Sequence, residues 1–238
     1  VLRQIEAVLT EYQEDPRWQD RDIQGHFWLS QGRTLALVND TDYDLVITTF
    51  KRATRVFFDT GEDQWGNLTM NRIGESYFQQ GHFSEAETWF LRSQRGFNTL
   101  LGQFPEEARH SDKKHTLRHR QVLQGVQRTL GNLARVYSYT GRFYWAFTCA
   151  YSELQIVRSL ERNSKELVHS LNTLAQMSAL TGHSMAARKL LDETQLHLEH
   201  LKVPLQSSEV KLNLFGLEFR QQALTYPLEY YLASEVQG

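Results

Sequence analysis

The sequence predicts an all-α fold of stacked helical hairpins, and three observations lead to it. First, the 238-residue chain contains only 14 Gly and 4 Pro, so long helices can form almost everywhere. Second, hydrophobic residues make up 40% and charged residues 23%, which is typical of a packed protein rather than a disordered one. Third, one spacing pattern recurs along the chain, which indicates an array of similar helix pairs.

The recurring pattern combines a small residue, a glycine seven positions later and a second small residue five positions after that. Its three copies are Gly74, Gly81 and Ala86; Ala134, Gly141 and Ala146; and Ala175, Gly182 and Ala187. Before the glycine, apolar residues at helical spacing give a first helix one apolar face. The glycine is expected in the left-handed conformation that ends this helix, and the first small residue is expected to let the second helix approach closely.

We expect one domain over residues 1–238, with elements that follow from this pattern. The second repeat matches the pattern best, and Trp28, Gly32 and Leu35 indicate a degenerate first repeat whose own turn, at residues 39–42, is longer. In order, the expected elements are an N-terminal helix at 1–21, repeat 1 at 22–58, repeat 2 at 64–101, a basic insertion at 102–127, repeat 3 at 128–162, repeat 4 at 165–201, and a capping helix with a tail at 207–238.

The C-terminal elements are inferred from the periodicity of the sequence. Leu212 falls 41 residues after Leu171, which predicts a further first helix or a capping helix. The apolar stretch 226–232 needs a cover, and three covers stay open: the last hairpin, a second copy in a homodimer, or a missing repeat. Because the chain begins at Val1 rather than at Met, we expect it to be a fragment of a longer protein.

The pattern resembles the tetratricopeptide repeat. The second repeat matches nearly all of that consensus, including Tyr77, Phe83 and Phe90. The third and fourth repeats depart from it where Glu153 and Thr194 replace the last Ala, and no unit ends in the usual Pro. The resemblance implies a right-handed α-solenoid in which the first helices line a concave groove.

The period of the repeats exceeds the standard 34 residues. Phe83 follows Tyr43 by 40 residues, Phe143 follows Phe83 by 60, and Ser184 follows Phe143 by 41. Together with the link at 59–66, this period resembles the sensor arrays of STAND-type signalling NTPases and related bacterial transcription regulators. The resemblance implies a sensor that binds an inducer or partner and acts on a neighbouring domain.

The resemblance also implies which side chains face the groove, because fixed positions of the first helix do so in this family. The candidate residues for ligand or partner binding are Arg33, Asn71, Glu75, Phe78, Arg128, Arg135, His169, Asn172 and Gln176. Arg and Asn side chains can hold a peptide carboxylate by charge-assisted hydrogen bonds. The full set of a chaperone-tail clamp is missing, since Gly131 occupies one of its positions.

The insertion is strongly basic. Residues 109–128 contain six Lys or Arg and one Asp, although the whole chain has a net charge of −2. One interpretation is an anion-binding surface, and the other is a solvated extension of two long helices joined by a loop. No aromatic residues are interleaved, which disfavours binding of single-stranded nucleic acid. The anion-binding candidates are Arg109, Lys113, Lys114, Arg118 and Arg120.

We expect no catalytic residue, cofactor or metal site. The sequence lacks a phosphate-binding glycine loop, a dinucleotide fingerprint and a nucleophile elbow. His115 and His119 are four residues apart, but no third metal ligand accompanies them. No apolar run approaches the roughly 18 residues that a membrane helix needs, so no membrane association is expected.

Two other features are interpreted as packing. Cys149 is the only cysteine, so it forms no internal disulfide. We expect Cys149 to be a small buried residue, and we expect the protein to act in the reducing cytoplasm. The aromatic run at 143–147 is expected to pack between helices.

These observations favour a non-enzymatic sensor or scaffold. It would recognise a protein, a peptide or a small effector in its groove and relay this to a regulatory or signalling domain. The alternative is an adaptor that binds anions or nucleic acid through residues 109–128. An enzyme is disfavoured, because no paired acid, base and nucleophile stand out.

Overall fold

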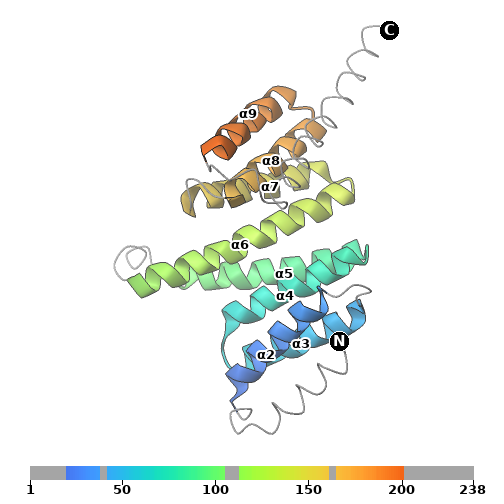
Figure 1. Ribbon diagram of the computed structural model, residues 1–238, viewed down its shortest axis with the longest axis vertical. Helices are drawn as coiled ribbons and strands as arrows, with labels where there is room; N and C mark the ends of the chain where they lie inside the picture. Colours follow the sequence, from blue (N-terminus) through green and yellow to red (C-terminus); the bar gives the residue numbers. More distant parts are fainter. Residues whose placement is uncertain (1–19, 38–41, 105–112, 161–164, 201–238) are drawn as a thin grey trace. The chain divides into compact units, whose positions relative to one another are not determined.

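The computed structural model describes residues 20–37, 42–104, 113–160 and 165–200, and every regular element within these ranges is an α-helix (Figure 1). This confirms the all-α helical-repeat fold. The N-terminal helix expected at 1–21, apart from its last two residues, and the capping helix and tail expected at 207–238 lie outside the described residues. The chain divides into two compact units, Val1–Val136 and Tyr137–Gly238, and each is described by itself.

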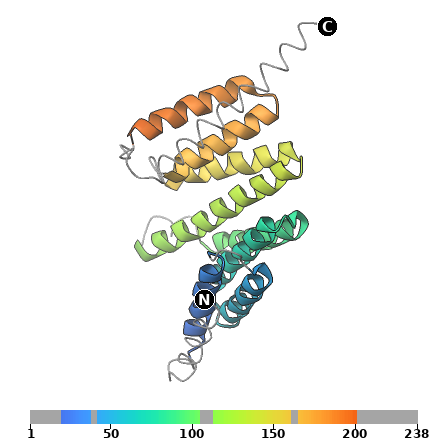
Figure 2. The ribbon, with the colours of Figure 1, turned by 45° about the vertical axis from the view of Figure 1, so that its right-hand side comes forward.

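The first unit contains two complete helical hairpins and most of a fifth helix. These helices are α2 (Arg21–Leu35), α3 (Tyr43–Asp59), α4 (Asp63–Gln79), α5 (Phe83–Gly102) and α6 (Lys113–Tyr139). Each of α2 to α4 packs against the next helix along the chain, as the ribbons in Figures 1 and 2 show. Helix α5 meets α6 where Gly125 lies against the Phe97 ring.

Helix ends follow from local sequence. The Asp42 carboxylate accepts a hydrogen bond from the backbone N–H of Leu45 at 3.1 Å and so caps α3, which satisfies a donor that has no partner within the helix.

The predicted left-handed glycines are confirmed, and a fourth occurs in the turn between α3 and α4. The φ angles are +77° at Gly61, +78° at Gly81, +74° at Gly141 and +81° at Gly182.

Close contacts between glycine and phenylalanine join the helices of the first unit. A Cβ placed on Gly74 of α4 would come within 2.6 Å of the Phe90 ring of α5, a separation that real Cβ atoms do not adopt. The same relationship links Gly32 to the ring of Phe50, at 2.5 Å. Both rings are at most 2% exposed. The small residue of the pattern therefore makes room for an aromatic ring in the core.

The basic insertion is helical where the structure describes it. Since α6 begins at Lys113, residues 113–127 extend the first helix of the third repeat by about four turns. Val122 and Val126 on this extension are buried. The length of α6 agrees with the long-helix part of the second interpretation. Residues 105–112, where a joining loop would lie, are outside the described part.

The second unit contains α7 (Phe143–Leu160), α8 (Lys165–Leu180) and α9 (Ser184–His200). Helix α8 packs against both α7 and α9. An ion pair between Arg158 and Glu193, at 2.7 Å, also joins α7 to α9. The predicted small residues Ala146 and Ala150 are fully buried.

The expectation for the aromatic run at 143–147 is wrong for most of its residues. Tyr144 is 72% exposed and Trp145 is 56% exposed. With Ala146 facing the core, helical rotation of 100° per residue turns these two neighbours outward. The run therefore contributes to the surface of α7 rather than to packing between helices.

Glu153 is the departure of the third repeat from the family pattern, and its side chain is buried at 2% exposure. Its carboxylate accepts a hydrogen bond of 2.9 Å from the hydroxyl of Ser170 on α8. A buried carboxylate needs such donors, because its desolvation is costly. The polar pair therefore replaces the small apolar contact that alanine makes at this position in the family.

Candidate functional site

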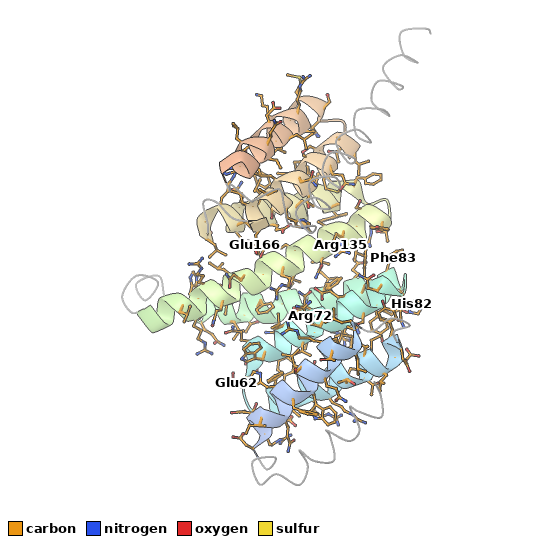
Figure 3. All side chains as sticks on the ribbon, in the orientation of Figure 1. Glu62, Arg72, His82, Phe83, Arg135 and Glu166 are labelled. Atoms are coloured by element: carbon orange, nitrogen blue, oxygen red, sulfur yellow. The ribbon has the colours of Figure 1, made fainter. Side chains whose placement is uncertain are left out.

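A pocket of about 250 Å³ lies between α4 and α6 in the first unit. Arg72 and Arg135, both labelled in Figure 3, project from these two first helices. The seven residues that line the pocket are Arg72, Glu75, Phe78, Gln79, Phe90, Asn132 and Arg135. It combines two guanidinium groups, one carboxylate and two aromatic rings, so it can hold an anionic group beside an apolar one.

Polar side chains connect the two walls of the pocket. The Asn132 amide on α6 donates to a carboxylate oxygen of Glu75 on α4 at 3.1 Å. Arg72 donates to the other oxygen of the same carboxylate at 2.6 Å. Glu75 is therefore held from both helices, and its negative charge is already neutralised by Arg72.

Arg135 has a different environment. Its guanidinium carbon lies 4.5 Å from the centroid of the Phe78 ring, a cation–π contact that orients the planar group. Its polar contact is a long one of 3.5 Å to the side-chain oxygen of Asn132. Arg135 is exposed, and its contacts with the described residues involve no carboxylate. Its N–H groups therefore remain able to bind an anion from outside.

Asn71 lies beneath this network rather than on the surface. Its side chain is fully buried, and its oxygen accepts from the Asn132 amide at 3.2 Å. Among the described residues its own amide nitrogen has no hydrogen-bond partner, which is unusual for a buried polar group. In this arrangement Asn71 positions Asn132 and does not itself reach a ligand.

The predicted groove residues fall into different settings. Glu75, Phe78 and Arg135 come together at the pocket. The other predicted side chains do not line the pocket. In the first unit, Arg33 on α2 and Arg128 on α6 are exposed. On α8 of the second unit, His169 is exposed, Gln176 is half-buried and Asn172 is buried.

Sequence reasoning missed two polar residues of the pocket, Arg72 and Asn132. Arg72 precedes Glu75 by three residues, a spacing that brings side chains together on a helix and could have been recognised. Asn132 gave a weaker signal, since it is a polar residue beside the packing position Leu133. Its partner Asn71 is 61 residues away in the chain, so only the tertiary fold reveals the pair.

The candidates for anion binding are only partly described. The side chains of Arg118 and Arg120 are exposed on α6. Between them, His119 meets the ring of Phe104 edge-on with centroids 5.3 Å apart. Arg109 and the side chains of Lys113 and Lys114 lie outside the described residues.

The described residues give little support for a nucleophilic cysteine, a metal site or a membrane-spanning helix. Burial, together with the nearby charge of Glu153, raises the pKa of Cys149 from 9.0 to about 11, so the thiol stays protonated and is a poor nucleophile. Within the described ranges, no three His, Cys, Asp or Glu side chains gather as metal ligands. Among the described helices, none has the length and apolar character to cross a membrane.

These features define an all-α protein of stacked helical hairpins with a polar pocket between first helices. Residues 68–110 match the family model of the tetratricopeptide repeat. The chain thus contains a tetratricopeptide repeat that includes most of α4 and all of α5, which confirms the resemblance drawn from the sequence.

The solved structures include a protein with a similar fold, BtubC (BKLC) from P. vanneervenii. Its crystal structure matches with a TM-score of 0.63 and 15% sequence identity, covering 84% of this chain and 72% of that one. At this identity the likeness supports the fold alone. A search of curated proteins found no match.

Proposed function

We propose that this chain is a protein-interaction module whose first unit binds an extended peptide segment of a partner between α4 and α6. Tetratricopeptide repeats generally mediate interactions between proteins, and residues 68–110 form one. The observation that carries the proposal is the pocket in which Arg135 stacks on Phe78 beside the Glu75 network. A charged group and an aromatic ring together suit a peptide that has polar and apolar side chains.

The proposal includes a sensing role. Binding at α4 and α6 would be relayed to a neighbouring regulatory or signalling domain, in keeping with the long period of the repeats. A small effector could occupy a pocket of about 250 Å³, and the same residues would contact it. The single cysteine accords with the reducing cytoplasm as the place of action.

The test selects ligands without assuming their sequence. A random-peptide phage library is panned on the immobilised protein, and recovered peptides are measured against Arg135→Ala. The matched control is Arg55→Ala, which removes an exposed arginine of α3 that does not line the pocket. We expect the recovered peptides to lose binding to the first variant and to keep it for the second. Equal binding to both variants would place the peptide site elsewhere.

A further inference from the structure

We infer that a row of aromatic rings and cations on α2, α3 and α5 binds single-stranded nucleic acid. The row is defined by cation–π contacts and consists of Trp28, Arg52, Lys51, Trp89 and Arg92, with Tyr77 of α4 beside Lys51. None of these residues lines the pocket between α4 and α6. The inference therefore concerns a second site and goes beyond the proposed function.

Trp89 of α5 brings two positive charges together. The Lys51 ammonium on α3 lies 5.8 Å from the centroid of its ring, and the Arg92 guanidinium carbon lies 5.0 Å from the same centroid. Each cation is attracted to the ring, but two like charges at this separation repel each other. A bound polyanion would remove that repulsion.

The row continues on both sides of this pair. The Lys51 ammonium also lies 5.9 Å from the centroid of the Tyr77 ring, so it contacts two rings. On the next residue, Arg52 lies over the Trp28 ring of α2, with its guanidinium carbon 5.2 Å from the centroid. The three aromatic residues are half-buried and the three cations are exposed. Part of each ring therefore remains accessible from solvent.

The segments that contribute the cations contain no compensating negative charge. Residues 51–58 of α3 and 88–102 of α5 contain five Lys or Arg and no Asp or Glu. The acidic residues of the two helices precede or follow these segments. Among the described residues, neither Lys51, Arg52 nor Arg92 forms an ion pair with a carboxylate. These charges are therefore available to a ligand.

The combination of cations and rings suits a single strand of nucleic acid. Backbone phosphates form charge-assisted hydrogen bonds with Lys and Arg, and unpaired bases stack on aromatic side chains. An acidic peptide would use the cations and leave the rings without a role, and a duplex keeps its base faces stacked on each other. The basic insertion at 109–128 contains no aromatic residue, whereas this row alternates cations with rings.

The side chains have different roles in this binding. Arg52 and Arg92 lie over rings that hold their guanidinium groups in place, so the N–H edge of each can bind a phosphate. The flexible stem of Lys51 lets its ammonium move from the rings to a phosphate. That movement opens the accessible parts of Tyr77 and Trp89 to a base. The strand therefore crosses α3 with one phosphate at each cation.

The experiment measures fluorescence anisotropy with a labelled single strand of about 12 nucleotides, within the length that such sites cover. Three phosphate contacts predict a roughly 20-fold loss of affinity between about 50 and 200 mM salt. Lys51→Gln combined with Arg92→Gln should weaken binding and reduce that loss to roughly threefold, because one contact remains. The matched control, Arg188→Gln with Lys189→Gln, removes the same residue types from the exposed surface of α9. It should keep the affinity and salt dependence of the unmodified protein, and circular dichroism confirms that both variants are folded.

Several outcomes would overturn the inference. Equal weakening in the two double variants would mean diffuse charge attraction. An inorganic polyphosphate chain of the same charge should compete about tenfold less well, because it has no bases to stack; equal competition would show that the row recognises phosphate alone. If Arg118→Gln with Arg120→Gln abolishes binding while the variant of the row keeps it, the insertion is the site. The peptide site at Arg135 is tested separately by the phage experiment and stands or falls independently.

Discussion

The ring of Phe90 lies against Gly74 so closely that a Cβ on the glycine would come within 2.6 Å of the ring. The contact joins α4 to α5, and the ring is only 1% exposed. Phe90 also lines the pocket beside Glu75 and Arg135. One packing contact of the repeat therefore also forms part of the wall of the candidate site.

Replacing this glycine tests the contact. Gly74→Ala should destabilise the protein by about 1–3 kcal/mol, since the buried ring has little room to move away from an added methyl group. Urea unfolding followed by circular dichroism measures the change. The control is Gly102→Ala, where an added Cβ meets nothing within 4 Å, and we expect a change within about 0.5 kcal/mol. Equal effects of the two substitutions would contradict the packing role.

A second glycine acts through its backbone alone. Gly81 has φ of +78°, and an added Cβ would have no neighbour within 4 Å. Gly81→Ala should therefore cost about 1–2 kcal/mol from left-handed strain. Gly81→Asn should cost less, because Asn tolerates this conformation better than other residues. Thermal melts of the two variants make the comparison, and a larger loss for Asn would argue against a conformational cause.

The sequence predicted those parts of the fold that depend on local conformation. A turn glycine such as Gly141 follows from the need for positive φ, whatever surrounds it. The start of α6 could not be predicted in this way, since the pattern marks where a helix meets its hairpin partner and not how far it extends. The exposure of Trp145 was missed for a similar reason, because aromatic content does not say which way a side chain faces.

The candidate site was predictable to the extent that it depends on repeat position. Arg135 and Phe78 follow from the family's groove positions, and both line the pocket. Asn71 was predicted to contact a ligand, yet it is fully buried, with Asn132 of α6 bonded to it. Such an interaction joins residues of different repeats, and the pattern of one repeat contains no information about it.

The bridge between the pocket walls leads to a prediction about Asn132. Asn132→Ala removes the hydrogen bonds to Asn71 and Glu75. The buried oxygen of Asn71 then lacks a donor, so we expect a loss of about 1–3 kcal/mol in the free energy of unfolding. The control is Asn98→Ala on the exposed surface of α5, which should change little. A neutral Asn132→Ala would show that the bridge does not stabilise the unit.

The last prediction concerns Cys149, whose pKa is raised from 9.0 to about 11 by burial and by Glu153. At pH 8 the native thiol should react with a disulfide reagent far more slowly than the thiol of the unfolded chain, because little thiolate is present. Glu153→Gln should lower the pKa in part, since burial is the larger cause and remains.

The same shift makes stability depend on pH. Below pH 9 the thiol is protonated in both the folded and the unfolded chain, so its contribution to the free energy of unfolding is fully present. Between pH 9 and about 11 the unfolded chain releases the proton while the folded chain keeps it, and the free energy of unfolding therefore falls as the pH rises. Comparison with Cys149→Ala isolates this contribution from the titration of lysine and tyrosine. If both proteins lose stability equally across this range, the thiol of Cys149 titrates normally in the folded state.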